Sequence, residues 1–264
     1  KYRAARRIWS KFMVEQGAKD PRSLLLRFLT QTAGVSCTRE QPENNIVRTA
    51  LQALAAVMGG TQSLHTNSFD EALALPTEKA VRIALRTQQI IAHESGVTNT
   101  IDPLGGSYFL ETLTTEMEEK ANDYFRRIDK MGGIVRGIEN GFFQREIADA
   151  AFKQQRAQET GEKTIVGVND YRIDEPPYTD LLRVDDELER KQVRELKALK
   201  ATRDGKKAEA ALRALTKAAE KEGTRERPNF MPLLIDASRA YCTLGEIREA
   251  MVQVHGEYRE PAVF

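Results

Sequence analysis

The chain has 264 residues, 41% of them hydrophobic and 30% charged, which is typical of a globular protein with a sizeable core. Forty lysines and arginines balance thirty-nine aspartates and glutamates, so the net charge of +1 gives no reason to expect nucleic acid or an anionic membrane as a partner. Two distant cysteines, Cys37 and Cys242, exclude a disulfide framework and a Cys-x-x-Cys zinc site and favour a reducing, cytoplasm-like compartment, and no apolar run has the length of a membrane span.

The first half of the chain alternates helical and strand-like patterns. The predicted elements are a helix over 1–16, a strand over 23–28, a helix over 45–58, a strand over 61–66, a helix over 77–96 with Thr77 as N-cap, and a strand over 100–107. This alternation predicts an α/β fold with a parallel sheet, closed or open. Three strands cannot close a barrel, so a barrel requires strands outside this sequence.

The second half of the chain is predominantly helical in pattern. We expect a long helix over 110–131, another around 143–151, a short strand over 164–169, charged helices from Asp185 on, and two final helices over 231–240 and 247–254. Thr243-x-x-Glu246 has the spacing of a capping box. Thr202–Lys207 and Glu220–Pro228 are the expected flexible joints.

Apolar spacing also predicts which side of each helix faces the core. In the helix over 45–58 the predicted inward side chains are Ile46, Ala50, Leu51, Leu54 and Met58. In the helix over 77–96 they are Ala80, Ile83, Ala84, Thr87 and Ile91, and in the long helix they begin with Leu110, Leu113 and Met117.

The stretch Gly59–Glu71 gathers uncharged hydrogen-bonding side chains between two long helical patterns. Gln62 shares one strand face with Leu64 and Thr66, whereas Asn67 reaches the same region from the loop after the strand, which is the catalytic end of a (β/α) barrel. Ser68-x-x-Glu71 also has capping-box spacing, so both residues fit the start of a helical turn.

Classical catalytic sets are absent from the sequence. The three histidines lie on different predicted elements, and there is no Gly-x-Ser-x-Gly elbow and no Walker-type loop. The amides of Gln31 and Gln62 cannot transfer protons but suit the binding of a polar ligand. The residues therefore indicate binding and positioning more than acid-base catalysis.

Five motifs together are more specific than any of these patterns. They are Leu26-Arg27-x-x-x-Gln31-Thr32-Ala33-Gly34, Asn45-x-x-Arg48-Thr49, Gly59-Gly60-Thr61-Gln62-Ser63-Leu64-His65-Thr66-Asn67, Ile101-Asp102-Pro103-x-Gly105-Gly106-Ser107-Tyr108 and Ile165-Val166-Gly167-Val168-Asn169. In this order and spacing they resemble the methylmalonyl-CoA mutase family, the adenosylcobalamin-dependent acyl-CoA mutases. The resemblance extends over essentially the whole chain.

The resemblance implies a fold and a reaction. It implies that residues 1–131 are the later β/α units of a (β/α)8 TIM barrel and that residues 132–264 are a mostly helical C-terminal extension. In the family the CoA arm runs along the barrel axis, and adenosylcobalamin caps the C-terminal end of the barrel. The adenosyl radical then starts a carbon-skeleton isomerisation such as methylmalonyl-CoA to succinyl-CoA or 2-hydroxyisobutyryl-CoA to 3-hydroxybutyryl-CoA.

The resemblance also implies roles for individual residues. Gln62 resembles the amide that contacts the CoA arm, and Gln31 resembles a glutamine near substrate and corrin. Asn67 and Glu71 resemble the pair that holds the adenosyl ribose. Leu29 stands where many members carry a histidine, so one polar contact differs from the family pattern. No protein ligand to a metal is expected in this chain.

The family pattern implies partners as well. Its catalytic residues belong to the earlier half of the barrel, so we expect this chain, which opens on Lys1 without Met, to be a fragment or processed product with an incomplete active site. An Asp-x-His-x-x-Gly cobalamin motif is absent, as in split members whose cobalamin domain is a separate small subunit. The expected partners are that subunit, the N-terminal barrel half and an acyl-CoA, in an oligomeric enzyme. The alternatives are a catalytically silent assembly or acyl-CoA-binding protein and a CoA-binding barrel without radical chemistry.

Overall fold

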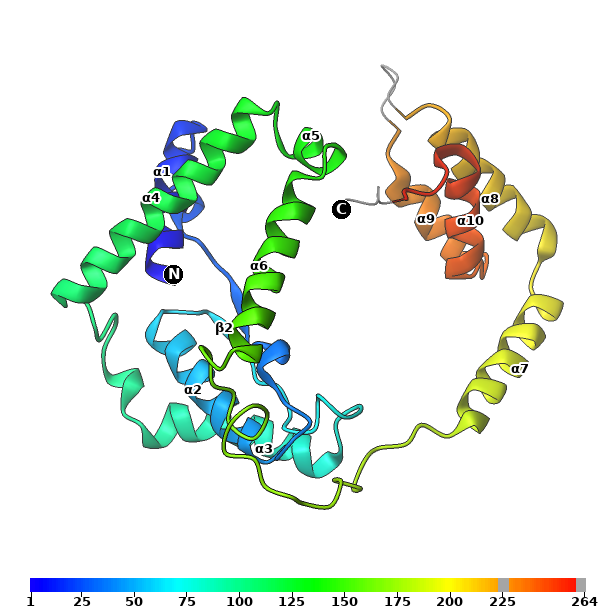
Figure 1. Cartoon of the computed structure of the whole chain (residues 1–264). Coiled ribbons are helices and arrows are strands. Elements are labelled where there is room, and N and C mark those ends of the chain that lie inside the picture. The colour runs from blue at the N-terminus through cyan, green and yellow to red at the C-terminus, as the bar shows by residue number, and fades with distance from the viewer. Residues whose placement is uncertain (223–227, 260–264) are drawn as a thin grey trace. The chain divides into compact units, whose positions relative to one another are not determined.

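The computed structural model describes residues 1–222 and 228–259. The chain divides into two compact units, Lys1–Arg183 and the part from Val184 on, and each is described by itself. The first unit contains α1 (Tyr2–Glu15), β1 (Leu29–Gln31), α2 (Asn44–Met58), β2 (Ser63–His65), α3 (Glu78–Glu94), α4 (Tyr108–Lys130), α5 (Ile134–Glu139) and α6 (Phe142–Glu159), with 3-10 turns η1 (Pro21–Leu24), η2 (Gly34–Ser36) and η3 (Val97–Asn99) (Figure 1). No helix within residues 1–222 and 228–259 combines the length and the apolar character of a membrane span.

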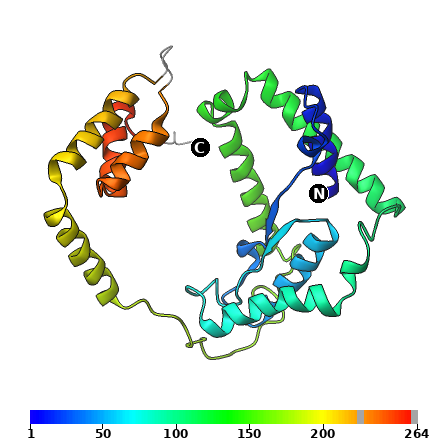
Figure 2. The ribbon, with the colours of Figure 1, turned by 180° about the vertical axis from the view of Figure 1, so that it is seen from behind.

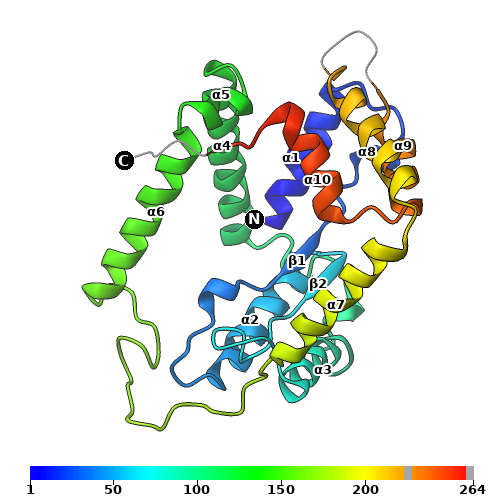
Figure 3. The same ribbon diagram turned by 90° about the vertical axis from the view of Figure 1, so that its right-hand side faces the viewer.

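The sheet consists of β1 and β2, which run parallel. Thr30 pairs with Leu64 at the centre of the register, and α2 forms the crossover between the strands (Figure 3). The Thr30 side chain is buried and bonds to Thr61 on the chain leading into β2, whereas Leu29 and Gln31 point to the exposed side. This arrangement is an α/β fold with a small parallel sheet.

The strand predicted over 23–28 begins later than expected. Pro21 opens η1 instead, because its fixed φ suits the first position of a helical turn and the Asp20 carboxylate accepts a hydrogen bond from the Arg22 N–H. The backbone is extended at Leu25, and strand pairing starts only at Leu29.

The strands predicted over 100–107 and 164–169 are wrong. Asp102 adopts a left-handed φ of +50° and its carbonyl accepts a hydrogen bond from the Gly105 N–H, so the first segment is a turn that leads into α4. The second segment makes only a single bridge between Val166 and Asp170, because the chain reverses at Gly167, where φ is +83°.

Two helices bury a different face from the predicted one. The buried stripe of α2 consists of Asn45, Thr49, Ala53 and Ala56, whereas Leu51 is 65% exposed. In α4 the buried residues are Thr114 and Glu118, not the apolar series that begins at Leu110. Small and polar side chains let these helices approach their neighbours closely. The predicted inward residues Ala80, Ala84, Thr87 and Ile91 of α3 are confirmed as buried.

Asn45 ties together the loops that follow the two strands. Its side-chain amide donates hydrogen bonds to the carbonyls of Thr38 (2.9 Å) and Phe69 (2.8 Å), and its Oδ1 accepts from the Thr38 N–H and the Arg48 guanidinium. Arg48 donates onward to the carbonyl of Val166 (2.7 Å). Asn45 is fully buried with every side-chain polar atom paired, so this residue fixes the separation of the two loops.

The helix pair α1 and α4 is held by charge (Figure 2). Arg3 of α1 bonds to Glu111 (2.6 Å) and to Asp102 at the turn before α4. Further along α1, the Lys11 ammonium donates to the Glu118 carboxylate of α4 (2.5 Å), and the Glu118 side chain is only 7% exposed. The α1–α4 contact therefore depends on paired ions, which apolar periodicity does not detect.

The second unit consists of α7 (Asp186–Thr202), α8 (Gly205–Ala219), α9 (Phe230–Arg239) and α10 (Leu244–His255). Helix α8 packs against α9 and α10 around the fully buried Leu215. Residues 223–227 of the expected joint at Glu220–Pro228 lie outside the described residues, and the expected joint at Thr202–Lys207 contains the break between α7 and α8. The boundary expected after residue 131 stays a prediction.

Glu246 is the electrostatic centre of the second unit. It completes the predicted capping box with Thr243, and its two oxygens accept hydrogen bonds from the two terminal nitrogens of Arg203 at 2.6 and 2.7 Å. Lys200 adds a third cation contact at 3.3 Å. The hydrogen bonds from Arg203 hold the pKa of the Glu246 carboxyl far below its usual value, and those from Thr243 act in the same direction.

We expect Asn45→Ala to lower the free energy of unfolding by about 2–4 kcal/mol, because it leaves buried backbone groups of Thr38 and Phe69 without partners. Urea denaturation of the chain measures the effect. Asn44→Ala is the matched control, since Asn44 donates only to the Gln41 side chain, and its cost is expected to stay below about 1 kcal/mol. Equal losses for the two variants would contradict the bridging role of Asn45.

We expect Glu246→Gln to destabilise the second unit at neutral pH by about 1–3 kcal/mol, and this difference to shrink as the pH falls from 4.5 toward the depressed pKa of Glu246 in the folded chain. The pKa of Glu246 is lower in the folded than in the unfolded chain. Its contribution is therefore complete above the usual glutamate value of 4.5 and is lost as the pH falls below it. Denaturation followed by helical circular dichroism at about pH 7 and about pH 3 compares this variant with Glu249→Gln, an exposed change on the same helix. A gap between Glu246→Gln and wild type that stays constant with pH would contradict the assignment.

Candidate functional site

Polar side chains meet where the two parallel strands end. Gln31 is the last residue of β1 and Asn67 follows β2 by two residues, and the Gln31 amide donates to Asn67 Oδ1 at 3.4 Å. The pairing continues past the strands, because the Thr32 N–H donates to the His65 carbonyl and the Asn67 N–H donates to Thr32 Oγ1. The carboxyl ends of the strands thus bring Gln31 and Asn67 together.

Glu71 joins this site from the turn after β2. A Cβ placed on Gly34 would lie 2.8 Å from Glu71 Oε1 and 3.2 Å from Asn67 Nδ2. The carboxylate and the amide therefore converge on the α-carbon of Gly34, in the turn η2 that follows β1. Gln31, Asn67 and Glu71, three of the four candidate residues, lie in one cluster.

The side-chain amide of Asn67 faces the Cys37 thiol but makes no hydrogen bond of normal geometry through its nitrogen. The residue is only 2% exposed, and its Nδ2 is buried. Buried amide nitrogens are almost always bonded, so an orphaned one beside an accessible carboxylate indicates a place for a ligand oxygen.

Cys37 lies at the same cluster, at the end of η2. Burial raises the pKa of the Cys37 thiol, and the negative charge of Glu71 adds to that shift. The side-chain amide of Asn67, the positive charge of Arg48 and the hydroxyl of Thr49 lower the thiol pKa and so oppose this shift. The thiol is therefore neutral at physiological pH and contributes a polarizable, uncharged surface to the site.

Gln62 lies away from the other three residues. It precedes β2, whereas Asn67 follows it, so the strand separates them. Gln62 Oε1 accepts from the Phe28 N–H (2.9 Å) and its Nε2 donates to the Gly60 carbonyl (2.9 Å). The side-chain amide thus extends the β1–β2 pairing by one step, a structural role that its place in the sequence does not reveal.

The segment Ser68–Glu71, whose capping-box spacing fits the start of a helical turn, does not begin a helix in the structure. The Glu71 N–H bonds to the Ser68 carbonyl, and α3 begins only at Glu78, where Thr77 is the N-cap, as predicted. The fully buried Asp70 holds this cap, because its Oδ2 accepts from both the N–H and the hydroxyl of Thr77. Asp70 and Gly34 are site-supporting residues that sequence reasoning missed, and only the small residues after the predicted strand hinted at Gly34.

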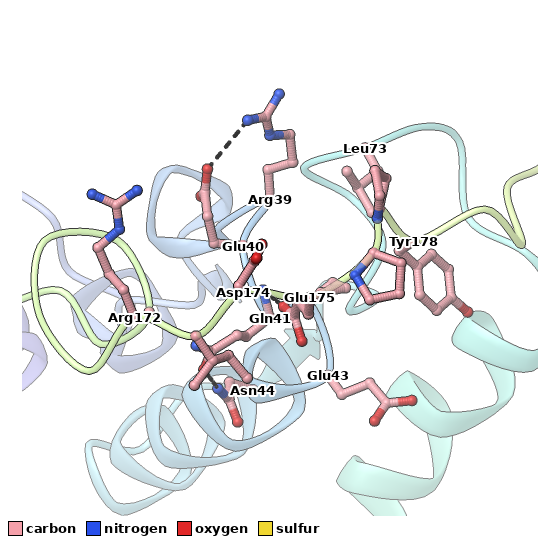
Figure 4. Close-up of a pocket in the computed structure, with 15 residues that line it drawn as sticks. Arg39, Glu40, Gln41, Glu43, Asn44, Leu73, Arg172, Asp174, Glu175 and Tyr178 are labelled. Atoms are coloured by element: carbon pink, nitrogen blue, oxygen red, sulfur yellow. Dashed lines mark hydrogen bonds and ion pairs between the residues drawn. The ribbon is translucent and has the colours of Figure 1, made fainter.

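Two pockets lie in the first unit. One, of about 610 Å³, is mainly apolar and is lined by Gln31 together with residues of α1, α2 and α4. The other, of about 670 Å³, lies between residues 39–44 and residues 167–178 and contains none of the four candidate residues (Figure 4). In this second pocket Gln41 bonds to Glu175 and to the Tyr171 carbonyl, so the two segments are fastened together. In the part of the chain that the structure describes, no group of three or more His, Cys, Asp or Glu side chains is arranged to hold a metal ion.

Comparison with known proteins agrees with the motifs. The family model described as methylmalonyl-CoA mutase matches residues 1–257. A probable mitochondrial methylmalonyl-CoA mutase of Caenorhabditis elegans is 46% identical over 98% of this chain and 34% of its own length. The large subunit of the 2-hydroxyisobutanoyl-CoA mutase of Aquincola tertiaricarbonis is 45% identical over 100% of this chain and 47% of its own.

The methylmalonyl-CoA mutase of Escherichia coli is similarly close, at 44% identity over 98% of this chain and 36% of its own length. The chain thus spans between a third and a half of the length of these curated relatives. The match over residues 1–257 includes both loops of the polar cluster and both structural units. The chain belongs to the methylmalonyl-CoA mutase family.

Proposed function

We propose that this chain is part of the catalytic subunit of an adenosylcobalamin-dependent acyl-CoA mutase, an isomerase that rearranges the carbon skeleton of an acyl-CoA. The observation that carries the proposal is the buried, unpaired Nδ2 of Asn67 beside the Glu71 carboxylate. Family membership and relatives named as mutases of methylmalonyl-CoA and 2-hydroxyisobutanoyl-CoA support the same reaction class.

The donor set of the cluster suits the ribose of an adenosyl group. Two neighbouring hydroxyls need both an acceptor and a donor, which the Glu71 carboxylate and the Asn67 amide supply. Adenosylcobalamin supplies radical chemistry when it is bound. Asn67 and Glu71 would orient its nucleoside, and the bulk of the cofactor would be held by a separate subunit or domain.

Gln31 and Gln62 are the residues we propose for the acyl-CoA. Gln31 lines the apolar pocket beside β1 and keeps part of its amide free for a ligand. Gln62 already bonds to two backbone groups, but an amide has two donor and two acceptor positions, so one of each is left for the CoA arm. Its role in this protein is therefore both structural and ligand-binding.

We further propose that the β1–α2–β2–α3 segment belongs to a (β/α)8 barrel completed by sequence outside this chain. A parallel pair with a helical crossover supports this, as does the chain's limited coverage of its relatives. The partners would be the preceding barrel segment and, by analogy with the relative named a large subunit, a cobalamin-binding small subunit in an oligomer. Two free cysteines fit a reducing compartment such as the cytoplasm.

Reconstitution tests the proposed function. The chain alone is expected to show no mutase turnover, and turnover with methylmalonyl-CoA or 2-hydroxyisobutyryl-CoA is expected once the preceding segment and the cobalamin-binding subunit are present. In that assembly Glu71→Gln should lower kcat with adenosylcobalamin by about tenfold or more while the melting temperature changes little, because it removes a charged acceptor from an exposed side chain.

Two results would contradict the proposal. Turnover by the isolated chain would refute the divided active site, and an assembly that binds acyl-CoA but never turns over would favour a silent binding or assembly protein. A large loss of stability in Glu71→Gln with unchanged kinetics would show that Glu71 is structural.

Gln62→Ala separates the two roles of Gln62. In the chain without any CoA, we expect a loss of about 1 kcal/mol in unfolding free energy, because the Phe28 N–H and the Gly60 carbonyl each lose a partner. Gln31→Ala is the matched control and should cost a few tenths of that, since its single bond to Asn67 is long. Denaturant titration of the three proteins measures this. Equal stability of the Gln62 and Gln31 variants would leave Gln62 with a ligand role alone.

A further inference from the structure

We propose that Gly34 is a positioning residue for the nucleoside of the cofactor, because the absence of a side chain at Gly34 lets the Glu71 carboxylate and the Asn67 amide converge. The inference rests on the proposed function. It adds Gly34, a residue of η2 without a side chain, to the residues that position the nucleoside. It predicts a substitution that harms ligand recognition far more than folding.

The space around Gly34 is limited by side-chain ends rather than by backbone. A Cβ at this position would lie 2.8 Å from Glu71 Oε1, which is too close for a methyl carbon, and 3.2 Å from Asn67 Nδ2, which is a tight contact that a small shift relieves. The φ of Gly34 is not in the left-handed region, so an alanine can adopt the backbone conformation without strain. The effect of an added methyl group is therefore confined to the two side chains that face it.

These two side chains respond differently to crowding. Asn67 is buried, its backbone N–H bonds to Thr32 and its Oδ1 accepts from Gln31, so it cannot turn away. Glu71 is exposed to solvent, so we expect its carboxylate to be the group that moves. Displacing an exposed carboxylate into water costs little stability, but it separates the acceptor from the unpaired donor of Asn67.

The neighbouring turn limits where the carboxylate can go. Cys37 closes the same 3-10 turn, with its N–H bonded to the Gly34 carbonyl at 3.0 Å, and its uncharged thiol lies beside Glu71 and Asn67. The turn η2 itself carries no cation, and Arg48, whose charge acts on the Cys37 thiol, already donates hydrogen bonds to Thr38, Asn45 and the Val166 carbonyl. The displaced state is consequently a solvated one rather than an alternative paired one.

The experiment compares two corrinoids on the assembled enzyme, which contains the preceding barrel segment and the cobalamin-binding subunit. Adenosylcobalamin carries a 5′-deoxyadenosyl group on cobalt where methylcobalamin carries a methyl group, so the ratio of their dissociation constants isolates the adenosyl contribution. Gly34→Ala is expected to weaken adenosylcobalamin binding by about tenfold, with methylcobalamin binding and the melting temperature nearly unchanged. Binding is followed by the absorbance of the corrinoid, without turnover.

Two further variants calibrate this measurement. Gly205→Ala, at the first turn of α8 with no atom near its would-be Cβ, should leave both affinities unchanged. Gly59→Ala meets the Tyr2 ring at 2.6 Å and should lower stability without changing the ratio of the two affinities. The two variants thereby separate a general loss of stability, caused by crowding at any glycine, from the loss of adenosylcobalamin affinity expected for crowding at Gly34.

A double-variant cycle tests the mechanism itself. Glu71→Asp shortens the side chain by one methylene group and makes room beside an alanine at position 34. In the Gly34→Ala background this change should cost clearly less adenosylcobalamin affinity than it does in wild type. Additive losses, or an unchanged corrinoid ratio in Gly34→Ala, would overturn the role of Gly34 while the proposed function stands. A wild-type enzyme without preference for adenosylcobalamin would overturn both.

Discussion

The buried amide of Asn45 is the interaction on which the first unit depends. Its four hydrogen bonds join α2 to the loop after β1 and to the loop after β2, through Thr38 and Phe69. Each loop carries part of the polar cluster, Gly34 and Cys37 in one and Asn67 and Glu71 in the other. The cluster thus owes its geometry to a residue that does not belong to it, and a fully satisfied polar network is well suited to fixing such a distance.

The helices of this fold could be predicted from sequence because each has local signals. The cap at Thr77, the capping box at Thr243 and the ends of the helices expected over 1–16 and 110–131 all appear close to the predicted places. The faces of α2 and α4 could not be predicted, because their buried stripes include Asn45 and Glu118, whose partners are distant in sequence. Apolar periodicity detects only the faces that bury apolar side chains. It misses these two faces because hydrogen bonds and paired ions make their contacts.

Local sequence signals likewise predicted one part of the candidate site and missed another. Strand parity placed Asn67 in the loop after its strand, and the structure brings it together with Gln31 and Glu71. Parity did not reveal that Gln62 bonds to the backbone at the other end of β2, because strand pairing depends on register with Phe28. Nor did it reveal the crowding at Gly34, which exists only after both loops are folded. Propensity describes neighbours in sequence, whereas these roles are set by neighbours in space.

The sheet of two short parallel strands has a consequence for the chain on its own. Among the described residues neither strand has a second neighbour, so each presents one unpaired edge of backbone donors and acceptors. Leu25, Leu29 and Leu51 are all more than half exposed. Open edges beside apolar side chains favour strand addition from other molecules. We therefore expect the chain on its own to self-associate unless other strands cover these edges.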